Sequence, residues 1–138
     1  MALFRGGSDK PSKSEALRRV LEGRFEDREE LSRALQELAR FRDLKPEELL
    51  PLLSRSDATI RTFAQLQIGR RLDARSIESL LKRARTMSSR IQSLLLHTLL
   101  KARLDLALPA CKQIVAGEDP ELASQALEAL SSLPGAAI

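Results

Sequence analysis

Histidine and cysteine, which most often carry acid–base, metal-binding or thiol chemistry, are scarce in this chain. His97 is the only histidine and Cys111 is the only cysteine. A serine triad, a cysteine–histidine pair or a histidine-containing metal site would therefore have to be built around His97. We interpret His97 as a structural or surface residue of a helix. Cys111 lies in the apolar run PACKQIV, which predicts a buried thiol rather than a nucleophile.

Motifs that hold nucleotides or metals are also missing from the sequence. There is no G-x-x-x-x-G-K-[ST] loop, no G-x-G-x-x-G and no C-x-x-C. The acidic pairs Glu29–Glu30 and Glu47–Glu48 stand at predicted helix starts, where carboxylates stabilise the helix macrodipole. One cysteine excludes an intrachain disulfide and suits a reducing cytosol. No apolar run approaches the about 20 residues of a membrane span. We expect a soluble, cytoplasmic protein that is not an enzyme and has no catalytic residues, no cofactor and no metal.

The distribution of charge along the chain indicates a binding surface rather than a catalytic site. Residues 25–54 hold five basic and eight acidic residues, residues 55–103 hold eleven and three, and residues 104–138 hold one and five. A basic middle segment between acidic flanks favours an acidic partner, whether protein, nucleic acid or anionic membrane. The alternative is that arginine-rich helix faces only keep the domain soluble.

The elements that carry these residues are predicted to be helices. Leu and Ala dominate the apolar residues, Trp and Tyr are absent and only four Phe occur, so helix formers outnumber strand formers. Residues 1–13 are expected to be a flexible lead-in. Pro51 is expected to bend a helix, and Gly23 and Gly117 to end one. The residues expected to cap helices are Ser14, Asp27, Asp57, Asp73, Ser88, Asp105 and Asp119. We expect an all-α fold of about eight helices.

An internal repeat sets how these helices are arranged. Asp57, Ser88 and Asp119 are spaced by 31 residues, a spacing that we call the repeat period. The apolar positions in the same register are Ile60 with Ile91 and Leu122, Ala64 with Leu95 and Ala126, and Ile68 with Leu99 and Leu130. Since 31 is no simple multiple of the 3.6-residue turn, amphipathicity alone does not produce this pattern. It predicts an α-solenoid of stacked antiparallel helical hairpins. An ordinary helical bundle remains the alternative.

The repeats resemble HEAT repeats, in particular the short bacterial variety called HEAT-like or phycobilisome-lyase-type repeats. The best match is LPACKQIVAGEDPELASQALEAL at residues 108–130, where Pro109 precedes Leu122 by the expected interval. The second is LLPLLSRSDATIRTFAQLQI at residues 49–68, which keeps Asp57 and the Ile60–Arg61 pair. The resemblance covers about residues 27–138 and implies a fold rather than an activity.

The C-terminal residues LPGAAI resemble the start of another repeat. We therefore expect residues 14–138 to be a HEAT-like repeat domain that is cut before its next repeat. A natural end that frays is the alternative.

The basic residues are the candidate binding site. Arg70 and Lys101 are one repeat period apart, so in a solenoid they lie side by side on neighbouring repeats. The predicted partner-binding residues are Arg61, Arg70, Arg71, Arg90, Lys101 and Arg103. Basic residues at helix C-termini also stabilise the macrodipole, which offers a purely structural explanation for Arg70, Arg71 and the cluster at residues 82–85.

Two functions follow from this surface. The first is a non-catalytic protein–protein interaction scaffold, or adaptor, that binds an acidic protein on the basic surface of the solenoid. The second is nucleic-acid binding through the DNA backbone, because HEAT-like repeats occur in DNA-alkylation-repair glycosylases. The chain departs from those proteins because it lacks Trp and Tyr to stack on bases. The oligomeric state is left open.

Overall fold

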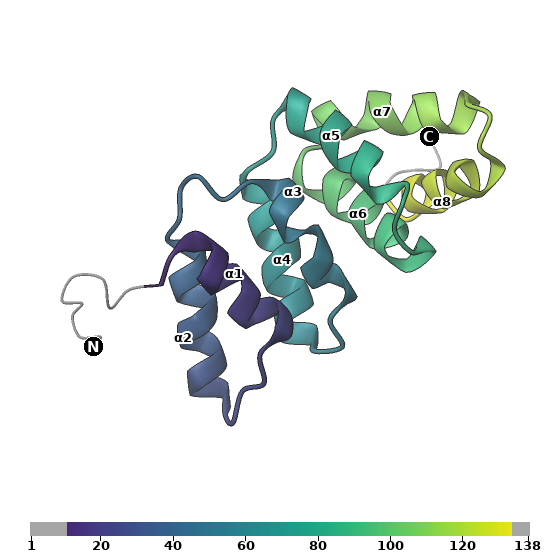
Figure 1. Ribbon diagram of the computed structural model, residues 1–138. Helices are drawn as coiled ribbons and strands as arrows, with labels where there is room; N and C mark the ends of the chain where they lie inside the picture. Colours follow the sequence, from purple (N-terminus) through teal and green to yellow (C-terminus); the bar gives the residue numbers. More distant parts are fainter. Residues whose placement is uncertain (1–10, 134–138) are drawn as a thin grey trace. The chain divides into compact units, whose positions relative to one another are not determined.

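The computed structural model describes residues 11–133 (Figure 1). This part of the chain contains eight α-helices, one 3₁₀ helix and no strand, which confirms the all-α prediction. Of the expected lead-in at residues 1–13, residues 1–10 lie outside the described part of the chain. The expected start of a further repeat lies outside them at residues 134–138.

The chain divides into two compact units, residues 1–44 and residues 45–138. This division was not predicted from the sequence. In the first unit, α1 (Lys13–Glu22) packs against α2 (Arg28–Ala39). The second unit contains α3 (Pro46–Leu49), the 3₁₀ helix η2 (Leu50–Ser54), α4 (Ala58–Arg70), α5 (Ala74–Ala84), α6 (Ser89–Ala102), α7 (Leu104–Ala116) and α8 (Pro120–Ser131).

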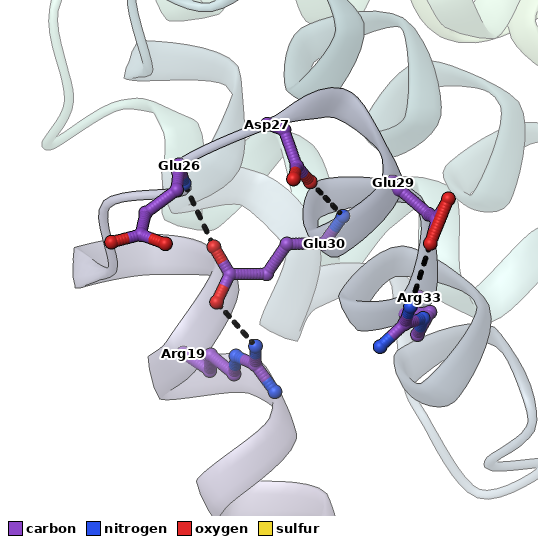
Figure 2. Close-up of polar contacts among 6 residues, drawn as sticks. All are labelled: Arg19, Glu26, Asp27, Glu29, Glu30 and Arg33. Carbon is purple, nitrogen blue, oxygen red and sulfur yellow. Dashed lines mark hydrogen bonds and ion pairs between the residues drawn. The ribbon is translucent and has the colours of Figure 1, made fainter.

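Acidic side chains fix where α2 begins, as Figure 2 shows. The carboxylate of Asp27 accepts a hydrogen bond from the backbone N–H of Glu30 at 2.8 Å, which satisfies one of the free donors of the first turn. The Glu30 carboxylate accepts from the backbone N–H of Glu26 at 2.8 Å and pairs with Arg19 of α1 at 3.5 Å. Glu29 forms an ion pair one turn along the exposed face of α2. Glu29 and Glu30 therefore stand in the first turn of α2, as predicted.

Local capping explains the ends of most other helices. Gly23 and Gly117 are the C-terminal caps of α1 and α7, as expected. Pro51 lies in η2, where the α-helical hydrogen bonding of α3 gives way to a 3₁₀ turn. The expected N-caps of α4, α5, α6 and α8 each accept a hydrogen bond from a backbone N–H of the first turn; they are Asp57, Asp73, Ser88 and Asp119.

Two predicted N-caps are wrong. Ser12, rather than Ser14, caps α1: its hydroxyl accepts from the backbone N–H of Glu15 at 3.2 Å, and the Glu15 carboxylate accepts from the Ser12 N–H at 2.9 Å. Asp105 does not cap α7, because the helix begins one residue before it. Its carboxylate instead accepts hydrogen bonds from the Arg103 guanidinium at 3.0 and 3.1 Å.

The helices of residues 45–133 pack in two series. α4, α6 and α8 contact one another in that order, as do α3, α5 and α7, and the helices also pack as the consecutive pairs α3–α4, α5–α6 and α7–α8. Gln65 of α4 donates a hydrogen bond to the Thr98 hydroxyl of α6 at 3.0 Å. A Cβ placed on Gly69 would lie 2.8 Å from the Cβ of Ala102. Because residue numbers rise together along both helices, α4 and α6 run parallel.

The core of this unit consists of aliphatic side chains. Residues at the three register positions that follow the caps are buried in α4 and α6. Removing a Leu or Ile side chain fully from water stabilises a fold by about 1.5–3 kcal/mol. The largest fully buried side chains of the unit are Leu49, Leu50, Leu52, Leu53, Ile60, Ile68, Leu80, Leu95, Leu96, Leu99 and Leu100.

Candidate functional site

The six predicted binding residues do not form one cluster. They lie on α4, on α6 and in the links that follow these helices. Arg61 and Arg90 stand in the first turns of the two helices, whereas the other four stand at the C-terminal ends. Nine residues separate Arg61 from Arg70, and an α-helix rises roughly 14 Å over that length. The predicted site is therefore divided between the two ends of the parallel helices.

Packing of α4 on α6 brings Arg70 and Lys101 to the same end of the two helices. Arg70 follows Gly69 and Lys101 precedes Ala102, the two residues at the close approach. Both basic side chains belong to exposed residues. Neither side chain has a hydrogen bond or ion pair to another residue within the described part of the chain. We call Arg70 and Lys101 the basic end; it presents two unneutralised cations to solvent.

Two of the other arginines hold local structure. The Arg61 guanidinium donates to the carbonyls of Arg55 at 2.8 Å and Ser56 at 2.7 Å, which ties the link before α4 to the helix. The Arg71 guanidinium donates to the side-chain carbonyl of Gln67 at 3.2 and 3.3 Å. Their hydrogen-bonding capacity is therefore partly used within α4 and the links at its ends.

Arg103 has an ionic partner, whereas Arg90 has none among the described residues. The hydrogen bond from Arg103 to Asp105 raises the pKa of Arg103 and lowers the pKa of Asp105, so this cation already has a counter-ion. Arg90 is exposed, and no partner for its side chain occurs among residues 11–133. It stands near the N-terminus of α6, where the helix macrodipole does not stabilise a cation. Arg90 is therefore a third free cation, at the opposite end of α6 from the basic end.

A groove of about 600 Å³ lies between α5 and α7. Its apolar lining includes Ile77, Leu81, Leu106, Ile114 and Leu122. Lys82 and Arg85 of α5 line it, and so do Glu118 and Asp119 from the link before α8. The sequence did not predict this groove. Lys82 and Arg85 were interpreted as residues that stabilise the macrodipole, and the apolar residues of α5 and α7 come together only through packing. The one signal in the sequence is that Leu81 and Arg85 lie four residues apart on the same helix face.

The side chains considered for catalysis have ordinary structural surroundings. Cys111 is buried, as predicted, and burial raises the pKa of its thiol to about 11, so the thiol is protonated at neutral pH. His97 Nδ1 lies 3.3 Å from the hydroxyl of Ser132. Over the described residues, no group of three or more His, Cys, Asp and Glu side chains could hold a metal ion.

The fold places this chain in the all-α class, and comparison with known proteins does not assign it to a family. Searches against protein-family models, curated proteins and solved structures each found no match. The resemblance to HEAT-like repeats therefore stays a prediction. Between residues 11 and 133, no helix is long and apolar enough to cross a membrane.

Proposed function

We propose that residues 45–133 form a short α-solenoid of HEAT-like hairpins and that this solenoid is a non-catalytic, cytoplasmic scaffold for protein–protein interaction. The order of helix contacts supports this proposal. The contacts of α4, α6 and α8, and those of α3, α5 and α7, run in two parallel series. Each hairpin thus packs on the next, which is how repeat proteins build an extended surface from units that cannot bury their apolar faces alone.

The partner in this proposal is an acidic protein that binds at the basic end. The observation that carries it is the pairing of Arg70 and Lys101 beside the Gly69–Ala102 approach, with neither cation neutralised by a described residue. Residues 55–103 hold eleven basic and three acidic residues, so the surrounding field has the same sign. Exposed charges of this kind set association rate and specificity, and salt screens them.

Nucleic-acid binding is the second candidate. The free cations Arg70, Arg90 and Lys101 favour it, because neutralising phosphates needs only Lys and Arg. The chain has no Trp or Tyr, and only four Phe, on which unpaired bases could stack, so this second proposal is contact with the duplex backbone. Such binding would show a steep salt dependence with little preference for sequence.

A charge-reversal experiment separates these proposals. The variant Arg70→Glu/Lys101→Glu removes the basic end. The control Arg18→Glu/Arg42→Glu makes the same change in net charge at two exposed arginines of the first unit. Each chain is immobilised and exposed to a nuclease-treated lysate of the source organism, and bound proteins are quantified by mass spectrometry. We expect an acidic protein that the unaltered chain and the control retain and that the variant loses at least about tenfold, while circular dichroism shows all three chains folded.

Equal retention by all three chains would mean that the basic end is not the binding surface. If the unaltered chain retains no protein but shifts duplex DNA at low salt, and the variant does not, the scaffold proposal fails and the nucleic-acid proposal replaces it.

A further inference from the structure

The last hairpin, α7–α8, has an apolar face that the described residues leave open. Leu127 on α8 is 53% exposed. Leu104 on α7 is also exposed, and the other apolar residues of the face are partly exposed. We call this surface the end face, and its residues are Leu104, Leu108, Val115, Ala123, Leu127 and Leu130. Apolar side chains exposed together on one side of a hairpin commonly mark an interaction site.

The α8 part of the end face points away from α6. On the α6 side, Glu121 of α8 accepts a hydrogen bond from the Ser89 hydroxyl at 3.1 Å, and Ser132 lies 3.3 Å from the His97 ring. At 3.6 residues per turn, the opposite side of α8 carries Ala123, Leu127 and Leu130.

The α7 part points away from α5. On its α5 side, α7 lines the groove with residues that include Leu106, Pro109 and Gln113. The same helical geometry places Leu104, Leu108 and Val115 on the other side. Both halves of the end face therefore lie on the sides of α7 and α8 that face away from α5 and α6, where a further hairpin would pack if the two series were extended. Figure 1 shows α7 and α8 packed alongside each other at this position.

Four of the six residues of the end face have buried apolar counterparts in the preceding hairpin, α5–α6. Leu104 and Ala123 correspond instead to Asp73, which is the N-cap of α5, and to Gln92. Leu96 stands one repeat period before Leu127 and is 0% exposed. The residues that correspond in the same way to Leu108, Val115 and Leu130 are all buried; they are Ile77, Ala84 and Leu99. In the two series, α5 packs between α3 and α7, and α6 packs between α4 and α8. Leu96 lies on the α8 side of α6, because it stands two turns after Ser89, whose hydroxyl bonds to Glu121 of α8. The chain thus contains one example of this face with its occupant in place, and that occupant is a helical hairpin.

We propose that the end face is a docking surface for another helical hairpin of the same repeat pattern, which covers Leu127 as α7–α8 covers Leu96. The end face contains no ionisable side chain, so the matching surface is apolar and rich in Leu, Ile, Val and Ala. The acidic residues of α7–α8 lie off this face; Glu121, for example, is bonded to α6. This inference rests on the repeat stacking proposed above but not on the acidic partner.

The test uses the hairpin that the chain itself provides as the probe. Residues 103–138 are repeated directly after Leu133, so that the second copy of Leu104 stands one repeat period beyond the first. Stability of repeat proteins grows with each stacked unit. We expect the extended chain to unfold in one cooperative step with a Tm higher by about 5 °C or more, and the amides of α8 to exchange at least about tenfold more slowly.

Two substitutions tell docking from a general effect of added length. Leu127→Glu in the extended chain should remove most of the Tm gain, because it places a charge in the new contact. The matched control is Leu66→Glu: Leu66 of α4 is 55% exposed, but its register partners His97 and Glu128 do not belong to the end face. Leu66→Glu should keep the gain. In the unextended chain both substitutions should shift Tm by no more than about 2 °C.

Three results would overturn the proposal. The first is an extended chain that unfolds at the original Tm, with the added hairpin unfolded. The second is a Tm gain that survives Leu127→Glu, which would place the added hairpin elsewhere. The third is an unextended chain that sedimentation equilibrium shows to be a dimer and that Leu127→Glu dissociates, which would make a second copy the occupant. Retention of an acidic protein by Arg70 and Lys101 is measured in a separate assay, so failure of the end face leaves that proposal standing.

Discussion

The hairpins α5–α6 and α7–α8 have caps at the same spacing but differ in what surrounds them. Ser88 caps α6 and Asp119 caps α8 in equivalent positions, one repeat period apart. Leu96 of α6 is nevertheless fully buried, whereas Leu127 of α8 is exposed. The two leucines have the same place on their own helix, so their burial is decided by whether a neighbouring hairpin lies against that side. Local sequence therefore sets each helix, and packing between helices sets how much apolar surface each helix buries.

The largest expected effect comes from truncating these two leucines. Leu96→Ala should lower the free energy of unfolding by about 2–5 kcal/mol, because it leaves a cavity in a packed core. Leu127→Ala should lower it by less than about 1 kcal/mol, because little burial is lost. Urea unfolding followed by circular dichroism gives both values. Equal losses would show that α8 is covered as fully as α6.

A smaller effect is expected where α4 and α6 approach most closely. Gly69→Ala would place a Cβ 2.8 Å from that of Ala102, and such overpacking costs about 1–3 kcal/mol, offset by the better helix propensity of Ala, about 1 kcal/mol. We expect a net loss of stability in urea unfolding. The double variant Gly69→Ala/Ala102→Gly should lose less than the sum of the two single changes. Additive losses would indicate that the two helices do not touch there.

The smallest effect concerns the cap that begins the α5–α6 hairpin. The backbone N–H of Ser76 holds the pKa of Asp73 below its ordinary value of 3.8. A lowered pKa in the folded state means that this contribution to stability is present above the ordinary value and is lost as pH falls through the folded value. The difference in stability between the unaltered chain and Asp73→Asn should therefore shrink as pH falls below about 4. A difference that is constant from pH 7 to pH 2 would contradict this role for the carboxylate.

Helix ends were predictable because their causes are local. Asp57, Asp73, Ser88 and Asp119 each bond to a backbone N–H two or three residues away, and that spacing is visible in the sequence. The prediction was wrong for Asp105 because a short-range side-chain partner, Arg103, competes for its carboxylate. Nothing in the helical pattern marks the division of the chain after Leu44.

The candidate site was predictable only in part. Arg70 and Lys101 lie at the same end of neighbouring helices, as their spacing indicated. Arg61 and Arg71 proved to be engaged by nearby carbonyl groups, and composition does not distinguish an engaged arginine from a free one. The groove between α5 and α7 and the end face both depend on which helices pack together, so they become visible only once the hairpins are placed.

Amide hydrogen exchange tests most directly the claim that these hairpins stack in series, with α6 covered on both sides and α8 on one. Residues 95–100 of α6 should exchange most slowly, and the amides of α8 should exchange at least about tenfold faster. The extended chain should slow α8 until it approaches α6. Equally slow amide exchange of α6 and α8 in the unextended chain would contradict the account, because it would show that both sides of α8 are already covered.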